Sequence, residues 1–160
     1  MNTKNLPYRK GVNAYVIDSQ NNFLLVQKKS YGENQWDVSG GGLEEGESME
    51  IGILRELEEE LGTHKFKILA KSSKIDKYEW PKEARENGYR KHGKWWRGQK
   101  KYQFLVKFIG SKNELKAQKE EIRLIKWVPY EQLEDTLYSG GLSRELNLGA
   151  LLQDILAPLL

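Results

Sequence analysis

The clearest periodicity in the chain lies between residues 48 and 61. Apolar residues recur there every four positions, at Met49, Ile53, Leu57 and Leu61. This spacing places their side chains on one side of an α-helix. Gly62 follows at the position where helices commonly end. The pattern therefore predicts an amphipathic helix over residues 48–61 whose apolar stripe packs against a core.

Short apolar runs on both sides of this helix predict strands. They cover residues 12–18, 23–27, 66–70, 73–78, 101–109 and 122–128. The polar turn 19–22 joins the first two runs as a hairpin. A second helix starts at 129–133, and after a Ser-Gly-Gly break residues 143–156 repeat the amphipathic helical pattern. We interpret residues 79–98, with their single proline, their glycines and their tryptophans, as a partly irregular excursion from the sheet.

The order of these elements indicates the fold class. Strands surround two or three helices without the regular strand–helix alternation of parallel α/β proteins. The sequence therefore predicts an α+β fold with a mixed β-sheet between helices. A chain of 160 residues suits one domain, and we expect residues 1–160 to form a single domain.

Composition excludes several kinds of protein. The chain has no cysteine, so disulfides, zinc–thiolate sites and thiol nucleophiles are excluded. No apolar run is long enough to cross a membrane, and the first residues lack the apolar centre of a signal peptide. We therefore expect a cytoplasmic protein without a membrane partner. The net charge is only +3, but acids crowd into residues 44–60 and bases into 82–101, which suits a polyphosphate ligand.

Three acids of the predicted helix 48–61 share one of its faces. Glu56, Glu59 and Glu60 are spaced three and four residues apart, so their carboxylates can converge. Like charges at this spacing repel each other, and a cation would relieve the repulsion. Carboxylate oxygens suit Mg²⁺ or Mn²⁺, which also bridge substrate phosphates. The alternative is an acidic helix face that is simply solvated, which is common for isolated acidic runs.

Residues 41–63 favour the metal-binding alternative, because they resemble the Nudix box, G-x5-E-x7-R-E-U-x-E-E-x-G-U, with U a bulky aliphatic residue. Every constrained position matches except the last, where Thr63 replaces the aliphatic residue. The resemblance implies the Nudix α/β/α sandwich. It also implies hydrolysis of a phosphoanhydride in a nucleoside diphosphate linked to another group, with Mg²⁺ or Mn²⁺ as cofactor.

The same resemblance implies roles for individual residues. Glu56, Glu59 and Glu60 would ligate the metal ions, with Glu56 and Glu59 in the catalytic set. Arg55 would pair with an acid of the box and orient the site, and Glu47 would support it. Gly41 and Gly42 match a turn whose backbone helps to bind metal or phosphate.

Nudix enzymes often place one further acid outside the box. Glu120 and Glu121 precede the strand predicted at 122–128. Glu121 lies six residues before Trp127, an offset that resembles the metal ligand or base of the dinucleoside-polyphosphate and RNA-pyrophosphohydrolase branch. A solvated pair of loop acids is the alternative.

Three short segments also resemble that branch. They are Tyr8-Arg9, residues 36–48 (WDVSGGGLEEGES) and residues 96–100 (WRGQK). The resemblance implies that Arg9 approaches a phosphate and that Gln99 and Lys100 contact the polyphosphate. Tyr102 is a candidate to stack a base, with core or surface packing as its alternative. The chain departs from the branch at Val38-Ser39 and after Lys100, which leaves the substrate open.

Three functions are consistent with these patterns. The first is a metal-dependent pyrophosphohydrolase that cleaves a dinucleoside polyphosphate or a 5′-triphosphorylated RNA end. The second keeps the chemistry but acts on free or damaged nucleoside triphosphates or nucleotide sugars. The third is a non-catalytic module that binds nucleotide or RNA through residues 79–101. The intact set of box acids argues against the third, because decayed family members lose them.

Overall fold

The computed structural model describes residues 1–139 and 147–159. Within them, one mixed sheet has the strand order β4-β5-β1-β2-β6, with β3 paired to β1. The strands are β1 (Tyr8–Ile17), β2 (Phe23–Lys28), β3 (Ser39–Gly42), β4 (Phe66–Glu79), β5 (Gly98–Phe108) and β6 (Ile122–Val128). β1 and β5 are parallel, and the other pairs are antiparallel.

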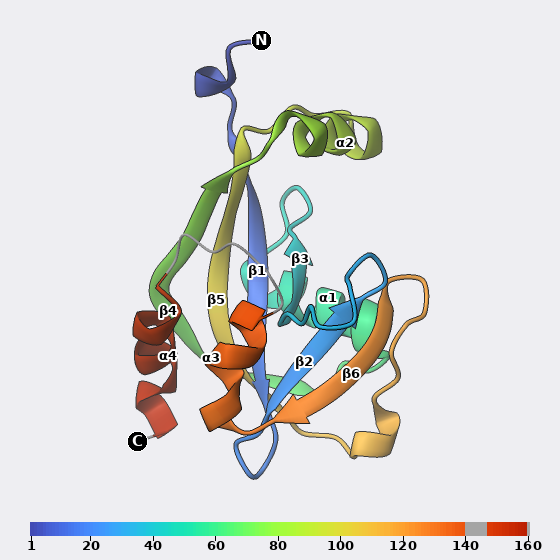
Figure 1. The fold of residues 1–160 in the computed structure, drawn as a ribbon, viewed down its shortest axis with the longest axis vertical. Helices are drawn as coiled ribbons and strands as arrows, with labels where there is room; N and C mark the ends of the chain where they lie inside the picture. Colours follow the sequence, from blue (N-terminus) through green and yellow to red (C-terminus); the bar gives the residue numbers. More distant parts are fainter. Residues whose placement is uncertain (140–146, 160) are drawn as a thin grey trace.

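Helices lie on both faces of the sheet. α1 (Met49–Leu61) covers one face, and α3 (Tyr130–Ser139) and α4 (Leu148–Leu156) cover the other (Figure 1). α2 (Lys82–His92) covers neither face and stands beyond the end of β4 and β5 (Figure 1). The α+β sandwich with a mixed sheet between helices is therefore confirmed, as is the hairpin of β1 and β2. No helix in the described parts of the chain is both long and apolar enough to span a membrane.

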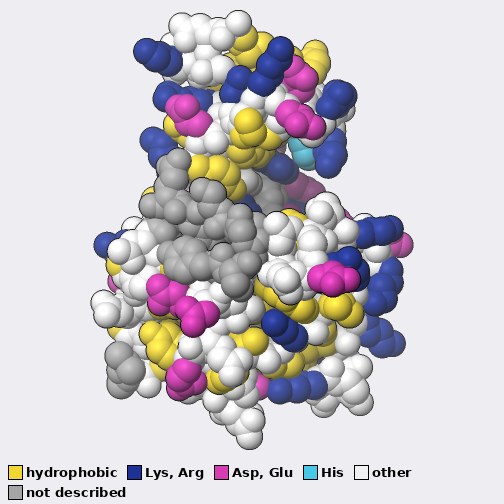
Figure 2. Space-filling view, in the orientation of Figure 1, with side chains coloured by type: hydrophobic (Ala, Val, Ile, Leu, Met, Phe, Trp, Pro, Cys, Tyr) yellow, Lys and Arg dark blue, Asp and Glu magenta, His cyan; other side chains and the backbone are white. Residues whose placement is uncertain are grey.

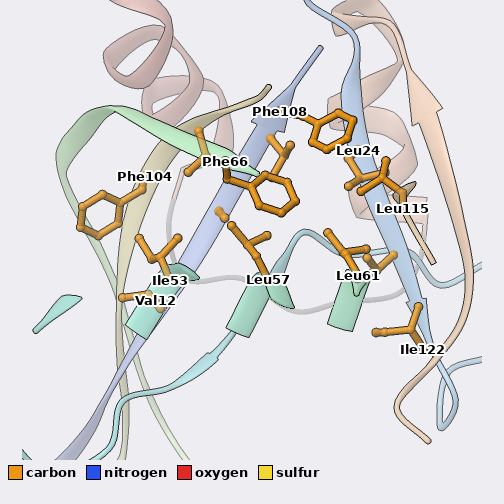
Figure 3. Close-up of a cluster of buried hydrophobic side chains, with 14 residues drawn as sticks. Val12, Leu24, Ile53, Leu57, Leu61, Phe66, Phe104, Phe108, Leu115 and Ile122 are labelled. Atoms are coloured by element: carbon orange, nitrogen blue, oxygen red, sulfur yellow. The ribbon is translucent and has the colours of Figure 1, made fainter. Parts of the chain in front are cut away.

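The apolar stripe of α1 forms one of two cores. Ile53, Leu57 and Leu61 are at most 1% exposed and point toward the sheet, where Phe66 and Phe104 are among their neighbours (Figure 3). Burial of each such side chain contributes about 1.5–3 kcal/mol relative to exposure. This packing fixes the rotation of α1 and so decides where its charged face points.

The second core lies on the opposite face of the sheet. Tyr15 and Leu105 of β1 and β5 are fully buried there. Leucines and an isoleucine of the two covering helices complete it, namely Leu133, Leu137, Leu148, Leu151, Leu152 and Ile155. Successive strand residues point to opposite faces, so β1 and β5 serve both cores at once.

Predicted and observed elements differ in three places, one of which is that Gly41 and Gly42, expected in a turn, belong to the strand β3. Residues 66–70 and 73–78 belong to one strand, β4, whose pairing with β5 shifts register twice and so breaks the apolar alternation. The excursion from the sheet expected at 79–98 is present, but residues 82–92 within it form the helix α2, which was not predicted. Gly88 is its one buried residue, so the helix has no apolar stripe that a periodicity analysis could find.

The C-terminal helix agrees with the prediction where it is described. Asn147 caps α4 by accepting a hydrogen bond from the backbone N–H of Ala150 at 3.0 Å. The predicted helix began at residue 143, but residues 143–146 lie outside the described part of the chain. The helix predicted to start at 129–133 is α3.

Candidate active site

α1 supplies most of the charged groups of the candidate site. Ser48 caps its first turn, because its Oγ accepts a hydrogen bond from a backbone N–H at 3.2 Å. Gly62, with φ of +77°, adopts the left-handed conformation that ends the helix. Between these ends the buried apolar stripe holds the helix in place, so that Arg55, Glu56 and Glu59 face the loop before it.

Arg55 lies at the centre of the charged face. Its Nε and Nη2 donate to both carboxylate oxygens of Glu47, at 2.6 and 2.8 Å. Its Nη1 donates to Glu56 at 3.1 Å and to Glu59 at 3.2 Å, while Nη2 also reaches the carbonyl of Gly42 at 3.0 Å. The hydrogen bonds from Arg55 lower the pKa of Glu47, and Glu47 in turn is the main cause that raises the pKa of Arg55. One guanidinium therefore ties three carboxylates to the glycine strand β3.

Glu56 is the buried acid of this cluster. Glu56 is only 9% exposed, and this burial is the main cause that raises its pKa to about 7. Attraction to Arg55 lowers this pKa, whereas repulsion by Glu60 and Glu59 raises it further. The negative charge of Glu56 is thus incompletely compensated by the side chains around it.

Glu60 is also buried but points elsewhere. The Ser39 Oγ and the backbone N–H of Gly40 both donate to its Oε1, the latter at 3.1 Å. Burial raises the pKa of Glu60, and attraction to Lys28 and these hydrogen bonds oppose that rise. The three helix acids that can converge by spacing therefore divide, with Glu56 and Glu59 on Arg55 and Glu60 against the start of β3.

The glycines of β3 let charged side chains approach its backbone. β3 pairs with β1 and lies against α1. A Cβ on Gly41 would overlap the carboxylate of Glu56, and a Cβ on Gly42 would overlap the guanidinium of Arg9. Any larger residue at either position would displace these charges. The carboxylate of Glu56 from α1 and the guanidinium of Arg9 from β1 therefore both lie against the backbone of β3.

Arg9 is held between Gly42 and Trp96. Its Cζ lies 5.0 Å from the centre of the Trp96 ring, which is a cation–π distance. Its buried Nε has no hydrogen-bond partner among the described residues. Burial is the main cause that lowers its pKa; attraction to Glu56 opposes this shift, and repulsion by Arg55 adds to it. An anion in this position would gain a charged partner that is already oriented.

These groups line a cleft with a volume of about 1060 Å³. Its floor is the loop 42–48 together with Arg55, Glu56 and Glu59 of α1. Tyr8, Arg9 and Lys10 of β1 form one side, and His92, Lys94 and Trp96 from the α2 end form the ceiling. Lys94 reaches across to Glu45 of the floor at 3.1 Å. The cleft thus has an acidic floor and a basic, aromatic ceiling.

Several residues singled out from the sequence lie outside the cleft lining. Gln99 is buried in β5, where it accepts a hydrogen bond from the Tyr78 hydroxyl at 3.0 Å. Lys100 and Tyr102 alternate with Gln99 and so belong to the opposite face of β5, where Tyr102 packs against the core under α1 and Lys71 sits 5.1 Å from its ring. Glu121 is exposed beside the start of β6, where its backbone carbonyl accepts from the N–H of Lys29. Gly41 touches the Glu56 side chain from behind the lining.

Sequence reasoning missed the ceiling of the cleft. In the sequence, no motif sets His92 and Lys94 apart from the other polar residues of the segment 79–98. Both line the cleft because α2 turns the chain back at Gly93, which has a φ of +70°. Gly93 is a recognisable helix stop, but only the fold shows which of the side chains after it face Arg9.

The donor set fits a hard divalent cation. Carboxylate oxygens of Glu56 and Glu59 and the carbonyl of Gly42 are the ligand type that Mg²⁺ and Mn²⁺ prefer. The buried, under-compensated charge of Glu56 is one that a cation would stabilise. In the described residues no three His, Cys, Asp or Glu side chains are already gathered at metal-ligand spacing. Arg55 supplies the counter-charge in this arrangement.

The family follows from comparison with known proteins. The family model described as NUDIX domain matches residues 7–145, which include Arg9, β3 and α1. The chain belongs to the Nudix family. As a Nudix hydrolase it is an enzyme that acts on phosphoanhydrides, in a family that typically uses divalent metal ions.

Curated Nudix relatives cover most of the chain. An RNA pyrophosphohydrolase from Zymomonas mobilis is 31% identical over 137 residues, which cover 83% of this chain and 86% of that protein. One from Pelagibacter ubique is 31% identical over 136 residues, covering 84% of each. Nudix hydrolase 26, chloroplastic, from Arabidopsis thaliana is 32% identical over 108 residues, covering 68% of this chain and 50% of that protein.

Solved Nudix structures share the fold. The E. coli dihydroneopterin triphosphate pyrophosphohydrolase superposes with a TM-score of 0.66 at 15% identity, covering 94% of this chain and 99% of that one. A C. elegans Ap4A hydrolase binary complex gives a TM-score of 0.62 at 17% identity, covering 93% and 97%. Identities this low establish the fold alone.

Proposed function

We propose that this Nudix pyrophosphohydrolase cleaves a phosphoanhydride bond in a 5′-triphosphorylated RNA or a dinucleoside polyphosphate, with Mg²⁺ or Mn²⁺ as cofactor. The cleft carries the proposal, because its acidic floor and basic ceiling face each other across a space large enough for a nucleotide. Two relatives that cover more than four fifths of the chain are named RNA pyrophosphohydrolases. An Ap4A hydrolase shares the fold.

Acidic residues in the cleft floor and around it, together with Arg55, hold and orient the reacting groups in this proposal. Glu56, Glu59 and Glu60 hold the metal ions, with Gly41 and Glu121 as further candidate ligands. Bound divalent ions neutralise phosphate charge and lower the pKa of an attacking water. Arg55 and Glu47 fix the acids in place through the paired hydrogen bonds at 2.6 and 2.8 Å.

The residues around the cleft bind the substrate in this proposal. Arg9 takes a phosphate, because its guanidinium is oriented in the cleft and its Nε lacks a described partner. Gln99, Lys100 and Tyr102 remain proposed contacts to the polyphosphate or base, although they lie behind the lining. Excluding water around these charges strengthens their interaction with phosphate.

The decisive experiment is product analysis. The protein is incubated with a diadenosine polyphosphate and with a triphosphorylated oligonucleotide, with Mn²⁺, with Mg²⁺ and with EDTA, and the products are separated by chromatography. We expect metal-dependent turnover of at least one substrate. Absence of turnover of both by folded protein would refute the proposal, and preferential turnover of free nucleoside triphosphates or nucleotide sugars would replace the substrate.

A single substitution tests whether turnover depends on the carboxylate of Glu59. Glu59→Gln keeps the size and one hydrogen-bond acceptor but removes the charge, so we expect turnover to fall by at least a hundredfold. Glu58→Gln, on the exposed side of the same helix, is the matched control and should leave turnover unchanged. Equal activities of the two variants would show that Glu59 has no part in the metal site.

A further inference from the structure

α2 is a helix without a core of its own. Of its described residues, only Gly88 is buried, and that glycine lies under Trp80 and Trp96. The helix stands beyond the ends of β4 and β5, away from both hydrophobic cores (Figure 1). It therefore adds little to the burial that stabilises the sandwich, and its exposed side chains are available for another role.

The α2 end of the molecule carries uncompensated positive charge. Residues 80–97 contain six Lys or Arg against two Glu. Three of these bases pair with acids, Lys82 with Glu86, Lys94 with Glu45 and Arg97 with Glu79, and Figure 2 shows basic side chains with acidic ones among them at this end. Arg85 donates to the backbone carbonyl of Trp80, and Arg90 donates to the side-chain amide oxygen of Asn87. Among the described residues, no acidic group lies within ion-pair distance of Arg85, Arg90 or Lys91.

An aromatic pair accompanies these charges. The rings of Tyr89 and Trp95 are stacked, with centroids 4.6 Å apart and planes at 11°. Tyr89 is 46% exposed, so the pair presents a ring to solvent. Arg85, four residues earlier on α2, lies on the same side of the helix as Tyr89, and Arg90 and Lys91 follow in the next positions of the helix. Cations beside exposed aromatic rings are the combination with which proteins bind single-stranded nucleic acid, because bases stack while the phosphates are neutralised.

This surface continues into the cleft. His92, Lys94 and Trp96 follow Tyr89 and Lys91 in the chain and line the cleft ceiling opposite the box acids. A chain whose 5′ phosphates lie in the cleft would therefore leave it along α2. A dinucleoside polyphosphate has no phosphodiester chain that could extend onto this surface.

We propose that residues 82–97 form a docking surface for the single-stranded RNA chain downstream of the nucleotides held in the cleft. This inference rests on the proposed function, and it favours an RNA 5′ end over a dinucleoside polyphosphate as the substrate. Arg85, Arg90 and Lys91 neutralise backbone phosphates, and the Tyr89–Trp95 pair stacks a base. Stacking needs an unpaired base, so a duplex of the same length should bind more weakly.

Binding is measured without catalysis, so that it does not depend on the active site. The ligands are a 5′-hydroxyl RNA of roughly eight nucleotides, the corresponding dinucleotide and a duplex of the octamer, in EDTA, with the salt concentration varied. We expect the octamer to bind at least tenfold more tightly than the dinucleotide, with an affinity that falls as salt rises. Equal affinities for octamer and dinucleotide would overturn the proposal.

The charges are tested with R90A/K91A. We expect the Kd for the octamer to rise about tenfold and the slope of log Kd against log salt to fall by about 1.4, because two phosphate contacts are lost. The matched control is K67A/K116A, which removes two exposed lysines away from α2, one of them at the opposite end of β4. If R90A/K91A binds the octamer with the same Kd and salt slope as the control variant, the surface does not bind RNA.

The aromatic pair is tested with Tyr89→Ala. Loss of one stacked base should weaken octamer binding about tenfold and leave dinucleoside polyphosphate turnover unchanged. Unchanged thermal unfolding checks that the variant folds, as expected for a side chain outside both cores. If Tyr89→Ala binds the octamer as tightly as the unaltered protein does, the stacking part of the proposal is refuted.

The two proposals fail in different ways. If wild-type protein hydrolyses neither triphosphorylated RNA nor dinucleoside polyphosphate, the proposed function is wrong, whatever the binding arm shows. If hydrolysis is normal but KM for triphosphorylated RNA does not change with RNA length or in R90A/K91A, the docking surface is wrong and the proposed function stands.

Discussion

At the scale of the residue, Arg55 and Glu56 show how burial and pairing divide the acids of α1. Arg55 reaches Glu47, Glu56 and Glu59 at once, yet the burial of Glu56 still raises its pKa to about 7. Hydrogen bonds from Arg55 lower the pKa of Glu47, whereas burial raises that of Glu56. Two glutamates that contact the same guanidinium therefore ionise in different pH ranges. Such a site has a strong preference for added positive charge.

The raised pKa of Glu56 predicts that the free energy of unfolding of the metal-free protein falls as the pH rises. The folded-state pKa of about 7 exceeds the ordinary value of 4.5, so the proton binds more tightly to the folded chain. The stability from this group is fully present below pH 4.5 and is lost as the pH rises through about 7. Glu56→Gln mimics the neutral form, so between about pH 5 and 8 it should gain on the order of 1–3 kcal/mol relative to wild type.

The measurement is urea unfolding in EDTA at several pH values, with Glu58→Gln as the control on the exposed side of α1. The stability difference between Glu58→Gln and wild type should stay nearly constant across the range. A Glu56→Gln difference that is equally flat would show that Glu56 titrates as an ordinary surface acid.

Trp96 is expected to act through Arg9. Its ring lies 5.0 Å from the Arg9 guanidinium, which Gly42 bounds on another side. Trp96→Leu and Arg9→Ala should each raise KM about three- to tenfold with little change in kcat. In the double variant the two effects should not add, because the loss of Arg9 leaves Trp96 nothing to orient.

Trp95→Leu is the matched control, because Trp95 stacks on Tyr89 and does not line the cleft. With a dinucleoside polyphosphate as substrate, its effect should be small and additive with that of Arg9→Ala. Full additivity of Trp96→Leu with Arg9→Ala would show that Trp96 serves the substrate or the fold independently of Arg9.

At the scale of the element, α1 depends on its caps and its stripe. Ser48 accepts a backbone hydrogen bond at the first turn, and Gly62 ends the last turn in a left-handed conformation. These caps set the length of the helix, and the stripe of Ile53, Leu57 and Leu61 sets its rotation. Both are visible in the sequence because they depend on local spacing.

The Ser48 cap can be tested by stability. Ser48→Ala leaves a first-turn N–H without its acceptor, so we expect a loss of about 1 kcal/mol. This corresponds to a decrease in Tm of about 2–4 °C for a chain of this size. Ser48→Asp keeps an acceptor and adds a favourable charge at the helix N-terminus, so it should retain wild-type stability. Equal Tm values for Ser48→Ala and wild type would argue against the cap.

At the scale of the whole molecule, the two faces of the sheet have different tasks. α1 and its core lie on the side that carries the acids, whereas α3 and α4 cover the other side (Figure 1). The helices α3 and α4 contribute no residue to the cleft lining in the described parts of the chain. Stability and activity should therefore be separable between the two cores.

Matched core truncations test this separation. Leu57→Ala and Leu152→Ala each remove a side chain that is at most 1% exposed, so each should cost about 2–5 kcal/mol of unfolding free energy. Leu57→Ala should also lower kcat, because Leu57 seats the helix that carries Glu56 and Glu59. Leu152→Ala should leave the kcat/KM of the folded fraction unchanged. Equal losses of kcat/KM in both variants would contradict the division.

The sequence by itself determined the family, the α+β class and the position of α1, because each depends on local spacing and on a motif of fixed offsets. It also predicted β2, β5 and β6 to within a few residues and the start of α3, whereas β1 begins at Tyr8 and not at residue 12. It did not reveal α2, because the one buried residue of this helix is Gly88 and no apolar stripe exists to be seen.

Only the tertiary structure decided which charges meet. Glu60 turns to Ser39 while Glu59 pairs with Arg55, and sequence spacing alone treats these two acids alike. His92 and Lys94 reach the cleft because the chain turns back after α2 and enters β5 beside β1. Contacts between segments far apart in the chain follow from sheet pairing and packing, and one-dimensional patterns do not encode them.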